Sequence, residues 1–478
     1  MSLSISELVA SLPVVEADAT SRSESLTELS MRAVPTGTFK RLSLLGGLQA
    51  QVAVAYGLHW LRGWFQNAGA RERDLAETHF RSAVRMLDTM GYLRGAVMKV
   101  GQTLANFPDF APSEMVETLD QLHFQAPPMH FGLLREMVVN ELGDEPEHIF
   151  AEFDETAFAA ASLGQVHRAR LKSGEEVAIK IQYPGIAKTI RTDFRNLIPM
   201  LLPARLTHDW ENLKSQVDFL RRSIEQETDY IREAGHLERA RSLFHEEDRI
   251  VVPRVYRELS TERILTMELL DGDHIDAFLA RDPSQDQKND FALHMMRASC
   301  RLCYRGRIGN PDWHPGNFLF LRDGRLGLLD FGCIVSYEDP TMWDKIRICG
   351  RAQSTGREEH VREAMRVWSD VDEDDKRYAA QLDAFAEFGR WAWRPIYNSG
   401  PFDYGNADYL NEGVTLFAEI ARKRMSRSHY TNLMQFRWEC SHRMMLYRLE
   451  ACIDGTPVME EEIQATGWDL SGFFSGRD

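Results

Sequence analysis

Two short motifs near the middle of this chain constrain its fold more than any other feature. Asp312 and Asn317 form a D-x4-N pattern, and Asp330 begins an Asp-Phe-Gly tripeptide 13 residues after Asn317. This joint spacing is typical of phosphoryl-transfer sites, in which the first Asp lies near the acceptor, the Asn binds one Mg²⁺ and the second Asp bridges metal and phosphates. Capping or turn roles are the alternative for Asp and Asn beside Pro or Gly, but they do not explain the shared spacing. We therefore predict Asn317 and Asp330 as metal ligands and Asp312 as the residue that orients the acceptor.

A predicted hairpin upstream supplies a candidate phosphate-binding lysine. Segments 164–170 and 177–182 have the composition of two strands, joined by a tight turn at 172–174. Lys180 lies near the end of the second strand, where kinase-like folds place a lysine that holds the α- and β-phosphates and pairs with a helical Glu. An ordinary solvent-facing strand lysine is the alternative. The motifs downstream favour the catalytic role.

The glutamate that pairs with Lys180 is expected in an acidic segment further along the chain. We predict Glu227, which lies 47 residues after Lys180 and begins a Glu-x-Asp pattern that ends at Asp229. Residues 211–245 are expected to form one long amphipathic helix that carries it. Helical carboxylates commonly form a solvated face, and that reading stays open for both acidic residues.

The predicted phosphate-binding loop lacks a G-x-G-x-x-G pattern and is rich in alanine instead. Alanine restricts positive φ and keeps the backbone further from a phosphate than glycine does, so the nucleotide should sit differently from that of a protein kinase. Side-chain hydrogen bonds from Ser162 and Gln165 can add to its binding. Residues 250–270 are expected to alternate as strands, and their last segment, 264–270, is expected to be the hinge between the lobes. The predicted nucleotide contacts, besides Lys180, are Ala159, Ala160, Ala161, Ser162, Gly164, Gln165, Met267 and Glu268.

Composition excludes several other classes of protein. The net charge of −16 disfavours a nucleic-acid partner, because phosphate backbones are bound by basic surfaces, and six cysteines in 478 residues do not suggest a secreted disulfide scaffold. Cys300 and Cys303 form a C-x-x-C pattern that is best explained by two buried thiols on a core helix. The first 19 residues resemble no secretory signal, so we expect a cytoplasmic protein, and peripheral membrane contact stays open.

The pattern along the chain predicts four regions. Residues 1–35 are expected to be a disordered tail, and 36–150 a helical extension in which the uncharged stretch 42–61 forms a buried or membrane-surface helix. Residues 151–270 would form a lobe with the hairpin, and 271–478 a helical lobe with the two motifs and further C-terminal helices. The expected class is therefore α+β, bilobal and predominantly helical.

With these motifs in place, the chain resembles the UbiB/ADCK (AarF-domain) family of atypical kinases. Lys99-Val-Gly-Gln102 matches the family's K-x-G-Q motif, and segment 159–165, the Glu-x-Asp pattern and the D-x4-N and D-F-G motifs match the others over residues 85–350. Asn310 and Trp313 replace the usual His and Pro of the catalytic loop. His236 stands where an Asn often follows the Glu-x-Asp pattern.

The resemblance implies a bilobal kinase-like fold wrapped by a helical extension, with ATP and Mg²⁺ as cofactors. It also implies that Lys99 and Gln102 gate the cleft, so that protein-kinase activity is inhibited. Such proteins look like ATPases or small-molecule kinases that support ubiquinone or other isoprenoid-lipid metabolism. Lipid or quinone-precursor ligands, membrane contact and biosynthetic protein partners are therefore expected.

Two other functions remain open at this point. One is a nucleotide-binding pseudokinase that scaffolds a biosynthetic complex without turnover. The other is a small-molecule kinase closer to the antibiotic phosphotransferases, which share the D-x4-N pattern. The sequence does not distinguish water from a metabolite as the acceptor, nor ATP from ADP as the preferred nucleotide.

Overall fold

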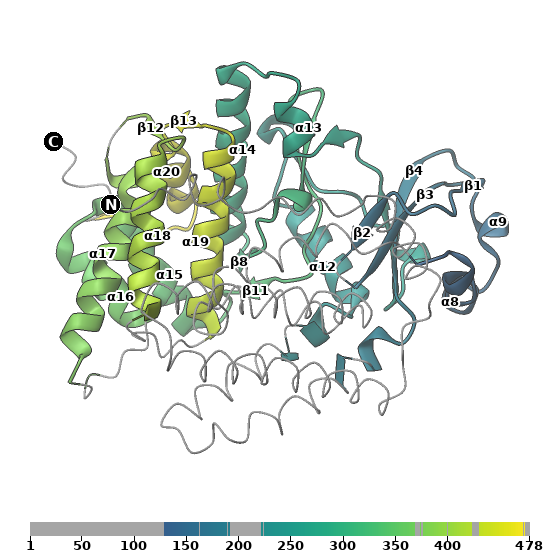
Figure 1. Cartoon of the computed structure of the whole chain (residues 1–478), viewed down its shortest axis with the longest axis horizontal. Coiled ribbons are helices and arrows are strands. Elements are labelled where there is room, and N and C mark those ends of the chain that lie inside the picture. Colours follow the sequence, from purple (N-terminus) through teal and green to yellow (C-terminus); the bar gives the residue numbers. More distant parts are fainter. Residues whose placement is uncertain are drawn as a thin grey trace, which may run out of the picture.

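The computed structural model describes the second and larger part of the chain. The described residues are 129–161, 163–188, 190–191, 221–222, 224–368, 373, 376–398, 400–422, 430–471 and 473. The predicted tail, the uncharged stretch 42–61, the residues Lys99 and Gln102, and Ser162 lie outside them. Within this part, a sheet with short helices packs beside a larger helical region (Figure 1).

The sheet lobe contains five strands in antiparallel pairing. β3 (Gly164–Arg170) and β4 (Glu176–Gln182) form the predicted hairpin, and β4 pairs with β6 (Ile264–Glu268) on its other side. Two short strands, β1 (Glu152–Phe153) and β2 (Ala159–Ala161), pair one after the other with the free edge of β3. The tight turn is confirmed, with Gly174 at a φ of 103° that favours glycine.

Side chains alternate along β4, so one face packs into the core of the sheet lobe and the other faces the helical lobe. Val177, Ile179 and Ile181 are fully buried in a core that they share with α8 (Gly132–Leu142) and its neighbour α9 (Pro146–Ile149). Because successive strand side chains point to opposite faces, Ala178 and Lys180 face the helical lobe instead. The hydrophobic pattern of this strand thus directs Lys180 into the space between the lobes.

The predicted long helix at 211–245 is not continuous, which corrects that expectation. Helical structure ends in a turn at Glu227–Thr228, and α12 (Tyr230–Arg241) begins anew after Asp229. Asp229 has extended backbone angles, and its carboxylate accepts a hydrogen bond from Arg232 N, so it is the N-cap of α12. The Asp229 cap therefore starts a new helix inside a segment that hydrophobic periodicity alone had predicted to be one continuous helix.

The helical lobe is built around α14 (Gln285–Tyr304), which packs against α20 (Thr456–Gln464) near the C-terminus. The described residues after the D-F-G segment are mainly helical, as predicted for the C-terminal helices (Figure 1). One hydrophobic core extends from Ala178 in the sheet lobe to Phe473. The other helices of this lobe are α13 (Ile275–Leu279), α15 (Pro340–Thr355), α16 (Glu358–Trp368), α17 (Tyr378–Tyr397), α18 (Ala407–Arg422) and α19 (Tyr430–Arg448).

Small sheets hold the two predicted motifs in place. β9 (Phe318–Leu321) and β10 (Leu326–Leu328) form a hairpin whose turn has Gly324 at φ 82°, and β5 (Ile250–Val251) and β7 (Gly272–Asp273) flank it. β8 (Ile308–Gly309) pairs with β11 (Val335–Ser336). A further pair joins β12 (Phe402–Asp403) to β13 (Cys452–Ile453). The D-x4-N loop lies between β8 and β9, and the D-F-G segment between β10 and β11.

None of the helices in the described part of the chain combines the length and the apolar character needed to cross a membrane.

Candidate phosphoryl-transfer site

A buried ion pair anchors the site between the two lobes. Lys180 Nζ lies 2.8 Å from Oε1 and 3.0 Å from Oε2 of Glu233, and 3.5 Å from Oδ2 of Asp330. The Lys180 and Glu233 side chains are only 9% and 3% exposed, whereas that of Asp330 is 31% exposed. The lysine of the sheet and the carboxylate of the D-F-G motif therefore face each other, as the sequence predicts.

The prediction of Glu227 as the partner of Lys180 is wrong. The partner is Glu233, six residues further along the chain. Glu227 lies in the turn before α12, whereas Glu233 lies on the buried face of α12 with Tyr230, Ala234 and Leu237. Glu227 remains close enough for its charge to raise the pKa of Glu233. Its carboxylate therefore borders the site without forming this pair.

Burial and neighbouring charges shift the pKa of Lys180 in opposite directions. Burial alone lowers the pKa of its ammonium group, but the carboxylates of Asp330 and Glu233 outweigh this effect, so the pKa lies well above its usual value. Burial also raises the pKa of Glu233, to about 7, with Asp330 adding to the rise and Lys180 opposing it. Lys180 is thus positively charged throughout the neutral range, and Glu233 is the member of the pair that titrates there.

The D-x4-N loop and the D-F-G segment are joined by hydrogen bonds. Asn310 Nδ2 donates to the backbone oxygen of Asp330 at 3.0 Å, and Asn310 Oδ1 accepts from the backbone nitrogen of Asp312 at 3.1 Å. The backbone nitrogen of Leu329 donates to the backbone oxygen of Asn317 at 3.0 Å. Asn310 therefore fixes the two motifs against each other.

Asn317 and Asp330 present oxygen atoms suited to a magnesium ion. Asn317 Nδ2 donates to the backbone oxygen of Asp312 at 3.0 Å, which leaves the amide Oδ1 as the atom available for a cation. Asp330 Oδ1 accepts from Gly332 N at 2.9 Å, so the carboxylate is held by its own tripeptide. Amide and carboxylate oxygens are the hard ligands that Mg²⁺ takes in proteins. The donor set fits the predicted metal.

The alanine-rich segment forms the tip of a hairpin. Ala159, Ala160 and Ala161 pair with Val166, Gln165 and Gly164, so the predicted loop is strand β2 and its turn. At Gly164 an added Cβ would lie 2.0 Å from the backbone oxygen of Ile181. This glycine is therefore required by the close approach of β4.

Gln165 does not face the nucleotide cleft, contrary to prediction. Its side chain lies on the face of β3 opposite Lys180 and is 1% exposed. Its Oε1 accepts from Met129 N at 2.8 Å, its Nε2 donates to the backbone oxygen of Met129 at 3.0 Å, and Nε2 lies 3.0 Å from His167 Nε2. A fully bonded amide inside the sheet core has no hydrogen bond left for a phosphate.

The predicted hinge residues point in different directions. Met267 pairs with Ala178 on the cleft face of the sheet and is 8% exposed, and its contact with a nucleotide stays a prediction. Glu268 lies on the other face, where its carboxylate accepts from Arg254 N at 3.1 Å and lies 3.6 Å from Arg241. Its carboxylate is therefore engaged by these two arginines, and a nucleotide contact from Glu268 stays a prediction.

Tyr230 and His236 are site residues that sequence reasoning did not assign. Lys180 Nζ lies 5.0 Å from the centre of the Tyr230 ring, a cation–π contact beneath the ion pair. His236 Nδ1 donates to the backbone oxygen of Phe331 at 3.0 Å and so ties α12 to the D-F-G segment. Tyr230 and His236 lie three residues before and after Glu233 on α12, and this helical spacing is the sequence signal that could have identified them.

Trp313 and His314 shape the D-x4-N loop. Trp313 Nε1 donates to the backbone oxygen of Asn310 at 2.8 Å, and its ring lies 4.8 Å from the His442 ring of α19, centre to centre. His314 Nδ1 accepts from Gly316 N at 3.1 Å, so its imidazole has a local structural role. The loop is thus supported by a helix more than a hundred residues further along the chain.

A family model described as an ABC1 atypical kinase-like domain matches residues 121–359. The chain belongs to this family of atypical kinases. The resemblance to the UbiB/ADCK proteins is thereby confirmed.

Individual relatives are similar at moderate identity. The chain is 30% identical to the mitochondrial atypical kinase COQ8B of Danio rerio over 64% of its own length and 50% of that protein. It is 30% identical to the AarF domain-containing protein kinase 1 of Mus musculus over 65% of its length and 57% of that protein. The chain therefore spans about half the length of these relatives.

A solved structure shares the fold. The structure of Rv3197 from Mycobacterium tuberculosis, described as a complex with erythromycin, superposes with a TM-score of 0.57 at 24% identity. The superposition covers 84% of this chain and all of that one. At this identity the similarity supports the predicted kinase-like α+β fold.

Proposed function

We propose that this protein binds a magnesium nucleoside triphosphate between its lobes and transfers the terminal phosphoryl group to water or a small molecule. The observation that carries the proposal is the position of Lys180, held between Glu233 at 2.8 Å and Asp330 at 3.5 Å. In kinase-like folds this arrangement aligns the α- and β-phosphates with the metal-binding carboxylate.

Each residue has a role that follows from its surroundings. Lys180 binds the phosphates, and Glu233 holds it in place from the buried side. Asn317 Oδ1 and the Asp330 carboxylate hold Mg²⁺, which would neutralise charge on the phosphates. Asp312 orients the attacking hydroxyl or water. Ala178 and Met267 form an apolar surface on the sheet for the base of the nucleotide.

The acceptor belongs to isoprenoid-lipid or ubiquinone metabolism under this proposal. The support comes from relatives named as COQ8 atypical kinases in Danio rerio and in Schizosaccharomyces pombe, the latter 31% identical over 74% of this chain. The same proposal includes peripheral membrane contact and biosynthetic protein partners. It also includes gating of the cleft by Lys99 and Gln102.

A nucleotide-dependent assay on four proteins tests the proposal. Phosphate release from Mg–ATP is measured for the natural protein and for Lys180→Met, Asp330→Asn and Glu268→Gln, with and without anionic liposomes and phenolic quinone precursors. We expect the first two variants to lose release by about a hundredfold or more, as loss of a transition-state contact does. The third should retain it, because its carboxylate lies on the far face of the sheet.

Two outcomes would overturn the proposal in different ways. Stabilisation by nucleotide without any phosphate release in the natural protein would favour a pseudokinase scaffold. Equal release by the natural protein and Asp330→Asn would exclude the D-F-G carboxylate from the chemistry.

A further inference from the structure

One buried hydroxyl next to the site has no partner within the described part of the chain. Tyr230 is the first residue of α12 and is 1% exposed. Its phenolic oxygen is buried, and none of the described residues forms a hydrogen bond with it. Buried tyrosine hydroxyls usually find a partner, because an unmade hydrogen bond in the interior costs the full desolvation of the group. This hydroxyl therefore requires an explanation.

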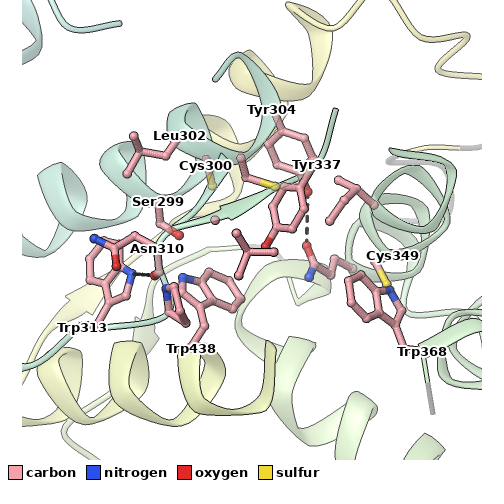
Figure 2. A pocket seen from close by; sticks show the side chains of 16 residues that line it. Ser299, Cys300, Leu302, Tyr304, Asn310, Trp313, Tyr337, Cys349, Trp368 and Trp438 are labelled. Atoms are coloured by element: carbon pink, nitrogen blue, oxygen red, sulfur yellow. Dashed lines mark hydrogen bonds between the residues drawn. The ribbon is translucent and has the colours of Figure 1, made fainter. Parts of the chain in front are cut away.

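Two other buried tyrosines show the usual arrangement. Tyr304, which lines the pocket shown in Figure 2, donates to Gln353 Oε1 at 3.4 Å. Tyr409 donates to the backbone oxygen of Trp391 at 3.3 Å, and its hydroxyl accepts from Arg443 Nε at 3.2 Å. Both hydroxyls are satisfied inside the helical lobe. The unpartnered hydroxyl of α12 differs from both.

Packing fixes the position of the Tyr230 ring. Its backbone nitrogen donates to the backbone oxygen of Glu262 at 3.1 Å. The ring lies in the core that joins the two lobes, together with Ala178, Leu265 and Ala234. Because the interior is closely packed, a side chain enclosed in this way cannot turn its hydroxyl toward another part of the protein. The unmade bond is therefore a property of the folded site.

The Tyr230 ring lies against the ion pair of the site. Lys180 Nζ is 5.0 Å from the centre of the ring. Burial raises the pKa of the Tyr230 hydroxyl above its usual value, and the Lys180 ammonium opposes this shift. The carboxylates of Glu233, Asp330 and Glu227 add to the rise in pKa. The hydroxyl thus stays protonated across the neutral range and is a neutral hydrogen-bond donor within the field of the site.

Lys180 alone cannot satisfy a phosphate group. An ammonium has three N–H donors, and Glu233 Oε1 and Oε2 take two of them, at 2.8 and 3.0 Å. The remaining contact, 3.5 Å to Asp330 Oδ2, is the one that a ligand can replace without breaking the pair. A phosphate presents several strong acceptor oxygens, so a second donor beside the ammonium would be used. The Tyr230 hydroxyl is such a donor.

Burial of the hydroxyl does not exclude a ligand. Lys180 is itself only 7% exposed, and the proposed function already requires the nucleotide to reach it. The Tyr230 ring is in contact with the ammonium group, so a phosphate that reaches Lys180 also comes next to the ring. The same movement of the lobes therefore admits a phosphate to both groups.

We propose that the Tyr230 hydroxyl is a further phosphate-binding group, which donates a hydrogen bond to a phosphate oxygen of the nucleotide held by Lys180. The inference rests on the proposed function and adds to it a residue that lies outside the D-x4-N and D-F-G motifs. The hydroxyl binds and orients the phosphate, and no proton is transferred. Its unmade hydrogen bond would then be completed by the ligand.

Tyr230→Phe tests the proposal, because it keeps the ring and its contact with Lys180 and removes only the hydroxyl. Binding of Mg–ATP to the full chain is measured by calorimetry, and the thermal midpoint is measured without ligand. We expect Mg–ATP affinity to fall about tenfold or more, as for the loss of a hydrogen bond to a charged acceptor. The midpoint without ligand should stay unchanged or rise, because the folded protein loses no hydrogen bond.

Tyr409→Phe is the matched control, because its hydroxyl is buried, has partners and lies in the helical lobe. It should lower the midpoint without ligand and leave Mg–ATP affinity within about twofold of the natural value. The two variants are thus expected to show opposite patterns. A lower midpoint with unaltered affinity in Tyr230→Phe would show a purely structural hydroxyl and would overturn the proposal.

Failure of this contact and failure of the proposed function give different results. Equal Mg–ATP affinity of the natural protein and Tyr230→Phe would overturn the phosphate contact and leave the proposed function. An equal loss with Mg–ADP would support the contact and place it on the α- or β-phosphate, whereas a loss with Mg–ATP alone would support it on the terminal phosphate. No Mg–ATP binding by the natural protein would contradict the proposed function and this contact together.

Discussion

Lys180 and Glu233 lie 53 residues apart in the sequence, and their side chains meet in a fully buried ion pair. The lysine comes from the cleft face of a sheet and the glutamate from the buried face of α12. Because both elements are fixed by packing, the pair holds the lysine ammonium toward Asp330 before any ligand arrives.

The first prediction concerns the identity of the partner carboxylate. Glu233→Gln should lower the free energy of unfolding by about 2 kcal/mol, less than the 3–5 kcal/mol for a wholly unpaired buried charge, because Asp330 remains near Lys180. Glu227→Gln is the matched control and should have a smaller effect. Chemical denaturation of both variants measures the difference. A larger loss for Glu227→Gln would reverse our assignment.

The second prediction concerns pH. Burial raises the pKa of Glu233 to about 7 in the folded protein, above its usual 4.5. Between these values the folded protein holds a proton that the unfolded chain releases, so this group's contribution to stability decreases as pH rises from 4.5 to about 7. Nucleotide affinity should change in the opposite direction, because ionised Glu233 fixes Lys180. Affinity measured from about pH 5.5 to about 8.5 should rise through about 7 and show no such step in Glu233→Gln.

A third prediction separates structure from ligand binding at Gln165. Gln165→Leu leaves the Met129 backbone groups and His167 without their partner and should cost about 1–3 kcal/mol of stability. Nucleotide affinity of the folded variant should stay within about twofold of the natural value. Thermal unfolding and nucleotide titration together check this. An intact stability with greatly weakened binding would restore the predicted phosphate contact.

The fourth prediction compares two glycine-to-alanine changes. Gly164→Ala would place Cβ 2.0 Å from the Ile181 backbone oxygen, which forces β3 and β4 apart. It should destabilise the sheet lobe by about 1–3 kcal/mol. Gly235→Ala on α12 meets only the end of the Arg257 side chain at 3.6 Å and should stabilise by up to about 1 kcal/mol. Equal effects of the two changes on the thermal midpoint would contradict the close approach of the strands.

The fifth prediction concerns the alanine hairpin. Ala160 pairs with Gln165 at its edge and is exposed. Ala160→Gly loosens the backbone and permits a closer approach to phosphate, so nucleotide affinity should change by at least about threefold. The ratio of ATP to ADP affinity is the most direct measurement. An unchanged affinity for both would place the phosphates elsewhere.

Sequence patterns predicted the parts of the site that depend on local spacing. The hairpin around Lys180 and the D-x4-N and D-F-G motifs were accessible because strand alternation and fixed loop lengths are local properties. Glu233 was missed because choosing between two carboxylates on a helix requires its start, and that start depends on the capping bond from Asp229. Once α12 begins at Tyr230, the buried face carries Glu233 with Tyr230, Ala234 and Leu237.

The direction of a strand side chain was a second source of error. Gln165 and Glu268 were assigned from their place in a motif, whereas alternation from Lys180 puts both on the far face of the sheet. That signal was present in the sequence. The partner of Gln165, the backbone of Met129, was not, because it lies 36 residues away and outside any motif.

The contact between Trp313 and His442 has a practical consequence for anyone who shortens this protein. The family match ends at residue 359, but the Trp313 indole lies against an imidazole of α19, and α14 packs against α20. A fragment cut at that boundary would leave the Trp313 side of the D-x4-N loop in water and expose one long side of α14. Recombinant work should therefore keep the C-terminal helices, since they belong to the same folding unit as the D-x4-N loop.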